Sequence, residues 1–227
     1  MEKFIRILFS PWIVPTCRAC NHFLTHNEYP LCWTCDKQLH KTNHFQHQFN
    51  HLCTDLSWRL PLFSAQSLTY FKQLSIEQRL LHQLKYRKSE KIGIWMGQQI
   101  AIEQRNCSFL SDVDVLLPIP MSHRSQRKRG YNQAEEIAKG IAQTLQIPIA
   151  FPLKKKHQKT STTKKDRKSR MAVTGNPFYS CSHLGSFKHA LIVDDVITTG
   201  STIAHFISAL ECDASTKISL VTFSHTL

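Results

Sequence analysis

The spacing of apolar residues changes repeatedly along this chain, and each change marks an expected element. Apolar and polar positions alternate between residues 65 and 71, which predicts a strand. Helical spacing follows at 75–85, beginning at Ser75, and again at 92–104. The same patterns predict the remaining elements: strands at 113–117, 148–153, 178–180, 187–193 and 217–223, and helices at 131–145 and 203–210. Strands that alternate with helices imply a mostly parallel α/β sheet, with ligands bound beyond the carboxyl ends of the strands.

One strand-to-helix junction is especially informative. The apolar run 190–193 ends in Asp194 and Asp195, and a short hydroxyl-rich loop then leads into the helix expected at 203–210. Free backbone amides and the helix dipole attract phosphate at such a junction. The residues expected to bind it are Thr198, Thr199, Gly200, Ser201 and Thr202. The two carboxylates suit ribose hydroxyls, or Mg²⁺ beside a pyrophosphate. The alternative is an ordinary turn with two solvated aspartates.

Two further loops are expected at the same edge of the sheet. In the first, the amide of Ile119 or Met121 can face a pyrophosphate oxygen, and arginines such as Arg124 and Arg129 can clamp it. A solvated basic turn is an equal alternative for any single arginine. The second loop, 154–170, carries nine Lys or Arg among seventeen residues. It can close over a polyphosphate, follow a nucleic acid strand or stay solvated.

Two Cys-x-x-Cys pairs stand eleven residues apart near the start of the chain: Cys17, Cys20, Cys32 and Cys35. Four thiolates form a closed tetrahedral shell that selects zinc or iron, so we expect a structural Zn²⁺. A deaminase-type site using His26 and Glu28 is rejected, because the histidine–glutamate pair and the cysteine pair would need separate helices. We place a zinc-finger module at 1–60 and an α/β domain at 61–227.

The chain has 227 residues and a formal net charge of +13, which favours anionic partners. No apolar stretch approaches the roughly 20 residues that a membrane-spanning helix needs. Residues 1–15 also lack the uninterrupted apolar core and cleavage site of a signal peptide. These features predict a cytoplasmic protein. A surface-lying anchor at 1–15, and with it a peripheral position at the inner membrane, stays open.

Taken together, these motifs resemble the ComF/GntX family of competence-associated phosphoribosyltransferases. The segments that carry the resemblance are Pro15-x-Cys17-x-x-Cys20, Leu84-Lys85-Tyr86, Pro118-x-Pro120, Arg129-Gly130-Tyr131-Asn132-Gln133 and Asp194–Thr202. The last of these is similar to the phosphoribosyl pyrophosphate (PRPP) loop of type I phosphoribosyltransferases. The resemblance implies a type I phosphoribosyltransferase fold with an N-terminal zinc finger. It also implies a role in natural transformation, in which single-stranded DNA crosses the inner membrane.

The expected ligand is therefore PRPP, with its 5′-phosphate at residues 198–202 and its ribose on the catalytic candidates Asp194 and Asp195. Mg²⁺ would bridge the ribose and pyrophosphate oxygens. One alternative is a non-catalytic module that holds single-stranded DNA or the translocation machinery, and another is a salvage phosphoribosyltransferase. No residue is identified as the base for an incoming nucleophile, so turnover of PRPP stays an open question.

Overall fold

The computed structural model describes residues 15–25, 28–86, 89–156, 175–181 and 187–226. The chain forms two compact units, residues 1–39 and 40–227. The segment 40–60, which the sequence analysis grouped with the cysteines, packs on the sheet of the second unit. Its Asn50 side chain donates to the carbonyl of Ala65 at 2.8 Å and caps the following helix. Residues 1–14, for which a surface-lying anchor was left open, and most of the basic loop fall outside the described residues.

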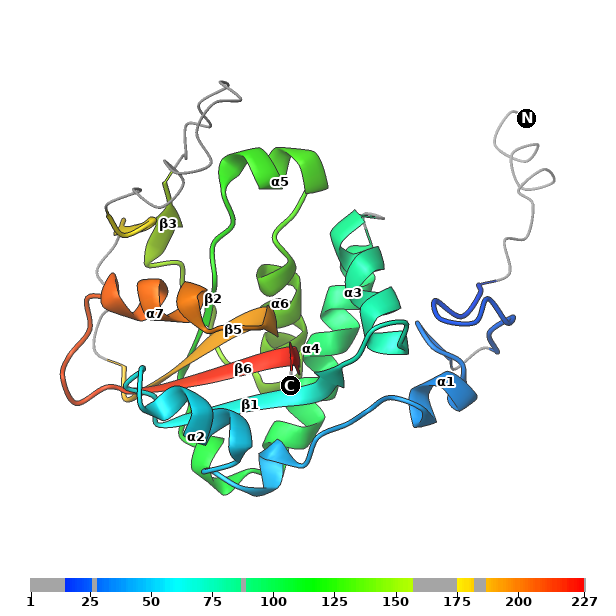
Figure 1. The fold of residues 1–227 in the computed structure, drawn as a ribbon, viewed down its shortest axis with the longest axis horizontal. Coiled ribbons are helices and arrows are strands. Elements are labelled where there is room, and N and C mark those ends of the chain that lie inside the picture. The colour runs from blue at the N-terminus through cyan, green and yellow to red at the C-terminus, as the bar shows by residue number, and fades with distance from the viewer. Residues whose placement is uncertain (1–14, 26–27, 87–88, 157–174, 182–186, 227) are drawn as a thin grey trace, which may run out of the picture. The chain divides into compact units, whose positions relative to one another are not determined.

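A four-stranded parallel sheet forms the centre of the second unit, in the order β1-β6-β5-β2 (Figure 1). Its strands are β1 (Ser64–Phe71), β2 (Val115–Pro118), β5 (His189–Ile197) and β6 (Lys217–Thr226). The register aligns Pro118 of β2 with Val193 of β5. The carboxyl end of β2 therefore lies directly beside Asp194 and Asp195.

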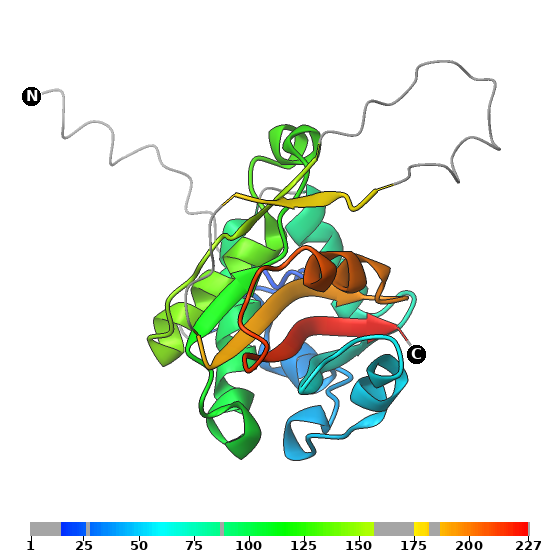
Figure 2. The same cartoon turned by 90° about the vertical axis from the view of Figure 1, so that its left-hand side faces the viewer.

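Helices cover both faces of this sheet, as strands buried on both sides require (Figure 2). One face carries α3 (Ile76–Tyr86), α4 (Glu90–Arg105) and α6 (Gln133–Leu145), and the other carries α2 (His51–Ser57) and α7 (Ser201–Ser208). The second unit also contains η2 (His44–Gln46), η3 (Ser108–Leu110) and α5 (His123–Arg129). Because α6 follows β2 on one face and α7 follows β5 on the other, a crevice opens between these two strand ends.

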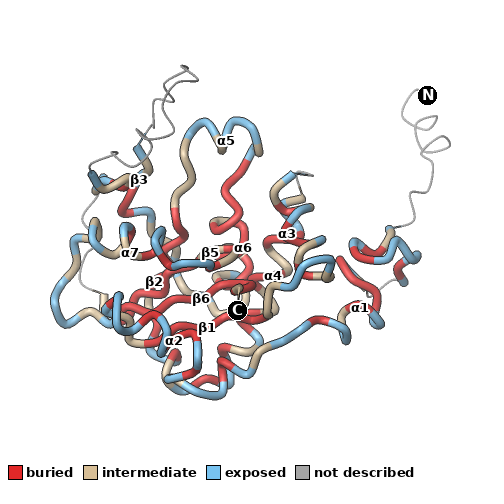
Figure 3. Tube along the Cα trace, in the orientation of Figure 1, coloured by how far each residue is buried: buried red, intermediate tan, exposed pale blue. Residues whose placement is uncertain are grey.

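The helices α4 and α6 pack with their backbones in contact. A Cβ atom at Gly97 would lie only 2.0 Å from the carbonyl oxygen of Ile137, and one at Gly140 would lie 2.0 Å from that of Ile94. Glycine is thus required at both positions for steric reasons. The strands and the inward faces of the helices are buried, whereas the outer faces are exposed (Figure 3). This packing fixes the amino end of α6 beside the crevice.

The strands expected at 65–71, 113–117, 187–193 and 217–223 are confirmed, but two others are not part of the main sheet. Residues 153–155 and 178–180 form β3 (Leu153–Lys155) and β4 (Phe178–Ser180), a separate antiparallel pair. The stretch 148–153 meets the main sheet only at the Leu116–Ile149 bridge. Pro148 and Pro152, which lie within this stretch, have no N–H to continue a ladder. Its assignment as a full strand is wrong for this reason.

Each edge strand of the main sheet is covered by one short extended segment. At β1, the Thr42 amide donates to the Leu68 carbonyl at 2.9 Å and the Tyr70 amide donates to the His40 carbonyl at 2.8 Å. At β2, the Leu116 amide donates to the carbonyl of Pro148 at 2.9 Å. Among the described residues, no helix has both the length and the apolar content needed to cross a bilayer.

Candidate functional site

A cavity of about 220 Å³ lies at the carboxyl ends of β2 and β5. Six of the residues predicted from the sequence line it: Ile119, Met121, Arg129, Asp194, Asp195 and Thr202. They come from two stretches of the chain, 119–129 and 194–202, which meet because β2 and β5 are neighbours. Arg124 lies on the exposed surface of α5 and is not part of the lining. The segments that follow β2 and β5 therefore meet at this edge of the sheet, and Lys155 joins them at the start of the basic loop, whose remainder lies largely outside the described residues.

Asp194 and Asp195 lie within β5, near its carboxyl end, rather than in the loop after it. The Asp194 Oδ1 atom accepts the amide of Asp195 at 2.8 Å. Burial raises the pKa of Asp194 from 3.8 to about 8, and the neighbouring Asp195 charge adds to this effect. Lys85 and Lys155 act in the opposite direction. Asp194 can therefore gain or lose a proton near neutral pH, as an acid–base group must.

The hydroxyl-rich loop makes a tight turn into α7. Gly200 has φ +76°, a left-handed conformation that favours glycine, and it is the residue before the first turn of α7. The Thr199 and Ser201 hydroxyls lie 3.0 Å apart and are exposed, as is Thr198. The first amides of a helix have no intrahelical carbonyl partner, so α7 offers donors at this turn. Phosphate binding by this loop stays a prediction.

The backbone at the Pro-Ile-Pro turn corrects one detail of the sequence analysis. The Ile119 amide donates to the Val193 carbonyl at 3.0 Å, which extends the β2–β5 pairing by one residue. This amide is therefore unavailable to a pyrophosphate oxygen, and that part of the prediction is wrong. Met121 also lines the cavity and remains the candidate amide donor of this turn.

The segment Arg129–Gln133 connects three parts of the site. Gly130 ends α5 with φ +91°, and the Tyr131 hydroxyl donates to the carbonyl of Leu84 in α3. The Asn132 side chain donates to the Ile119 carbonyl at 2.9 Å and caps α6 by accepting the amide of Ala134. The Arg129 guanidinium donates to Gln133 at 2.9 Å. This segment holds the Pro-Ile-Pro turn, α3 and α6 in place around the cavity.

Two lysines of the site had no individual role predicted from the sequence, although Lys155 belongs to the basic loop 154–170 expected at this edge. Lys85 lies in the last turn of α3, and its ammonium forms an ion pair with Asp195 at 2.8 Å. Lys155 of β3 also lines the cavity. Both residues are far from Asp195 in the sequence, and only the fold brings them close. The one signal for Lys85 was its place in the Leu84-Lys85-Tyr86 segment of the family resemblance.

The four cysteines of the first unit form a compact cluster. Their sulfur atoms all lie within 4.8 Å of one another, and Cys20 Sγ and Cys32 Sγ are 3.7 Å apart. Sulfurs bound tetrahedrally to zinc at about 2.3 Å are about 3.8 Å apart, so the cluster can hold one Zn²⁺. Burial would raise the pKa of the Cys17 thiol, but hydrogen bonds from neighbouring backbone amides outweigh it and lower the pKa to about 7.

Local hydrogen bonds shape the turn that carries the second cysteine pair. Glu28 Oε1 accepts the amide of Trp33 at 2.7 Å, and Oε2 accepts the amide of Thr25 at 2.8 Å. Trp33 begins α1 (Trp33–Lys37), which contains Cys35. Glu28 therefore has a structural role beside the cluster, which is consistent with the rejection of a deaminase-type site.

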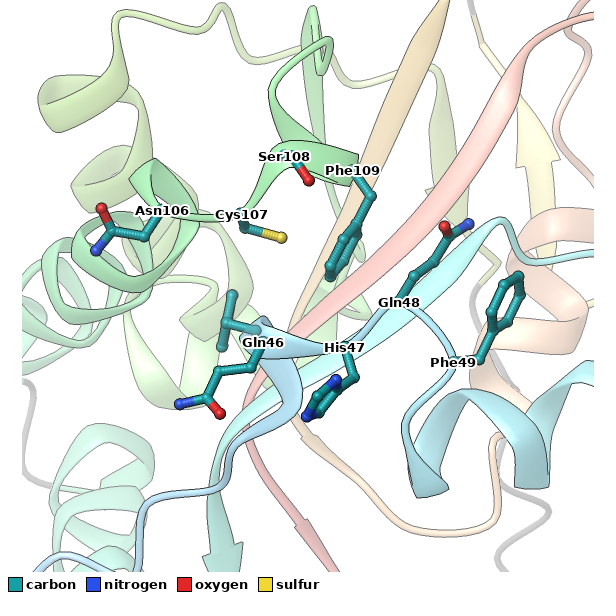
Figure 4. A pocket seen from close by; sticks show the side chains of 9 residues that line it. Gln46, His47, Gln48, Phe49, Asn106, Cys107, Ser108 and Phe109 are labelled. Atoms are coloured by element: carbon teal, nitrogen blue, oxygen red, sulfur yellow. The ribbon is translucent and has the colours of Figure 1, made fainter.

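A second cavity, of about 440 Å³, lies between the η2 and η3 segments (Figure 4). Its lining is mainly amide and aromatic side chains, among them Gln46, Gln48, Phe49 and Phe109. None of the residues predicted to bind a ligand contributes to it. It is therefore separate from the site at the ends of β2 and β5.

One buried array has the residue types of a hydrolase triad. His189 lies 2.6 Å from Asp112 and 2.7 Å from the hydroxyl of Ser219. Ser219 is fully buried and also contacts the Ser64 hydroxyl at 2.8 Å. A substrate cannot reach this oxygen, so the array joins β1, β5 and β6 and is not a nucleophilic site.

Comparisons with known proteins agree with this architecture. Residues 131–224 match the phosphoribosyl transferase domain family. The chain is 26% identical to competence protein F of Haemophilus influenzae over 200 residues. This alignment covers 82% of this chain and 80% of that protein. The chain is also 26% identical over 135 residues to DNA utilization protein YhgH of Shigella flexneri and of Escherichia coli K12, covering 58% of this chain and 59% of those proteins.

Proposed function

We propose that this chain, which is similar to competence protein F over most of its length and carries a phosphoribosyl transferase domain, binds PRPP in the cavity between β2 and β5. The observation that carries the proposal is the position of Asp194 and Asp195. They stand at the carboxyl end of β5, beside the first turn of α7, where the chain leaves neighbouring strands toward opposite faces. The ribose would lie on these carboxylates and the 5′-phosphate at residues 198–202.

The charges around the cavity suit a pyrophosphate group. Lys85, Arg129 and Lys155 line it together with the two aspartates. Carboxylate oxygens are the ligands that Mg²⁺ prefers, so Asp194 and Asp195 fit a Mg²⁺ that arrives with PRPP. Bound there, the ion would neutralise pyrophosphate charge. The cations of the chain would stabilise the same charge as it grows on a departing pyrophosphate.

Isothermal titration with PRPP and MgCl₂ tests this site. We expect the double substitution of Asp194 and Asp195 by asparagine to weaken PRPP binding by about a hundredfold, because two direct contacts are lost. The exposed Asp213, substituted in the same way, is the control and should bind as the wild type does. Equal affinities for the double variant and the wild type would refute the site.

A second activity is favoured by the surface of the cysteine module. Trp33 is 68% exposed and Phe23 is 66% exposed, and Lys37 lies 5.8 Å from the Trp33 ring. Exposed aromatic rings beside a cation are typical of surfaces on which unpaired bases stack. We infer that this module binds single-stranded DNA and that the whole chain acts in the cytoplasm on DNA that is being taken up.

A gel-shift series with a single-stranded oligonucleotide tests the second activity. Trp33→Ala should weaken binding several-fold. Trp58→Ala is the matched control, because Trp58 is 69% exposed and also lies beside a cation, 3.8 Å from the Arg59 guanidinium, but belongs to the other unit. Binding that does not weaken with added salt would exclude a phosphate-driven interaction. Equal losses in the two variants would contradict the assignment to the cysteine module.

A further inference from the structure

Lys85 forms an ion pair with Asp195, one of the two carboxylates proposed to bind the ribose and Mg²⁺. Its ammonium lies 2.8 Å from Asp195 Oδ2, and the two side chains are only 24% and 11% exposed. Within the described part of the chain, this oxygen is buried and receives no hydrogen bond beyond that ion pair. Lys85 therefore acts as a counter-ion supplied by the chain itself at the centre of the site.

The backbone that carries Lys85 is held firmly. The hydroxyl of the buried Tyr131 donates to the carbonyl of Leu84, the residue before Lys85. On the other side of Lys85, the Tyr86 ring lies 5.8 Å from the Arg129 guanidinium. Both contacts come from the segment that also shapes the cavity. The position of the Lys85 backbone is thus set by the site itself, and only its long side chain is free to rotate.

The Lys85 side chain borders two cavities. The first holds the aspartates, and the second, of about 240 Å³, is lined by residues of α3 and of the ends of β1, β5 and β6. The Thr198 hydroxyl gives this mainly apolar cavity one polar group, whereas the Gln78 side-chain oxygen already accepts the amide of Leu74 at 2.6 Å. The side chain can therefore leave Asp195 without entering a wholly apolar space.

Electrostatics determine when that move is favourable. A divalent cation that enters alone must displace the Lys85 ammonium and then lies among Lys85, Arg129 and Lys155, all of which border the cavity. Positive charges so close together repel one another in a partly buried site. A cation that arrives with PRPP brings phosphate oxygens with which the three cations can pair. The same ammonium therefore opposes the bare ion and tolerates the ion–PRPP complex.

We propose that Lys85 is a specificity-determining residue that keeps divalent cations off Asp195 until PRPP arrives, which makes cation binding depend on PRPP. This inference rests on the proposed function, because PRPP supplies the charge that releases the lysine. The Lys85 ammonium would lower the affinity of the empty site for free metal ions. Removal of the ammonium should therefore raise the affinity of the empty site for a divalent cation.

The test is a titration of the full, zinc-loaded chain with Mn²⁺ in the absence of PRPP, with free Mn²⁺ measured by electron paramagnetic resonance. Lys85→Met should bind Mn²⁺ about tenfold more tightly than the wild type, or more. Lys85→Gln, which keeps a polar side chain without the charge, should show the same gain and serves if the methionine variant does not fold. Adding Asp195→Asn to either variant should abolish the gain.

The matched control is Lys139→Met. Lys139 is also a partly buried lysine in an ion pair, 2.8 Å from Glu136, but it lies on α6 away from the cavity. It should leave Mn²⁺ binding unchanged. If neither Lys85 variant binds Mn²⁺ more tightly than the wild type, the inference is overturned. PRPP titrations of the wild type then separate the two ideas, because PRPP binding would uphold the proposed function while the role of Lys85 fails.

Discussion

Replacing Asp194 with asparagine should change how the stability of this protein depends on pH. Burial raises the pKa of Asp194 from 3.8 in the unfolded chain to about 8 in the folded protein. Between these values the folded state holds a proton that the unfolded state has lost. The contribution of Asp194 is therefore most favourable below about pH 4, and it falls as the pH rises toward 8. The asparagine side chain does not titrate in this range, so the stability of Asp194→Asn should not show this decline.

The size of the effect follows from proton linkage. One extra proton held by the folded state changes the free energy of unfolding by about 1.4 kcal/mol per pH unit. A measurement at about pH 5 and another at about pH 7 both fall between the unfolded pKa of 3.8 and the folded pKa of about 8. Over that interval Asp194→Asn should gain about 3 kcal/mol relative to the wild type.

The assay is urea unfolding followed by circular dichroism at both pH values, for the wild type, Asp194→Asn and the exposed control Asp213→Asn. Subtracting the wild type from each variant removes the contributions of titrating groups that do not interact with the substituted residue. The control should show no relative gain. Parallel pH profiles for the wild type and Asp194→Asn would refute the protonated carboxyl on which the reasoning rests.

Other regions give further expectations. Gly97→Ala should cost about 3 kcal/mol or more in urea unfolding, because its new Cβ would lie 2.0 Å from the Ile137 carbonyl oxygen, and an unshifted unfolding midpoint would contradict this contact. Tyr131→Phe should cost about 1 kcal/mol by the same assay, because the hydrogen bond to the Leu84 carbonyl is lost. Burial and neighbouring histidines lower the pKa of His44 from 6.5 to about 4, so its contribution to stability is present above about pH 6.5 and is lost as the pH falls toward 4. His44→Phe should therefore lose less thermal stability than the wild type between neutral and acidic pH, and equal losses would argue against the buried imidazole. Chelation of zinc should expose the four clustered thiols to a thiol reagent while the second unit keeps its circular dichroism, and unchanged thiol reactivity would argue against a bound metal ion.

Local pattern was enough to predict most of the fold. The alternation in 65–71 and the apolar face of 131–145 depend on residues near one another in sequence, and both elements are confirmed. The stretch 148–153 shows where local pattern fails. Its apolar residues fit a strand, but Pro148 and Pro152 within it have no N–H to donate, so it meets the outer edge of β2 at the Leu116–Ile149 bridge and does not continue as a strand.

The residues of the candidate site also fall into those that local motifs predict and those that only the fold brings together. Asp194, Asp195 and the four cysteines are contiguous or closely spaced motifs, so their chemistry was visible in the sequence. Lys85 was not assigned a role, because its partner Asp195 is distant in sequence and the two meet only once α3 has packed on β1 and α4. The prediction for the Ile119 amide was wrong for a different reason. Ile119 does line the cavity, but its amide donates to the Val193 carbonyl and so cannot donate to a pyrophosphate oxygen.

The covered edges of the main sheet have a consequence for solubility and assembly. Unpaired strand edges are templates on which sheets of different molecules join. Here the segments around Thr42 and Pro148 occupy the outer sides of β1 and β2. Growth of the sheet by adding a second molecule is therefore opposed at both ends. Variants that loosen either segment should show their defect first as aggregation during expression, well before they lose the ligand site at the other end of the strands.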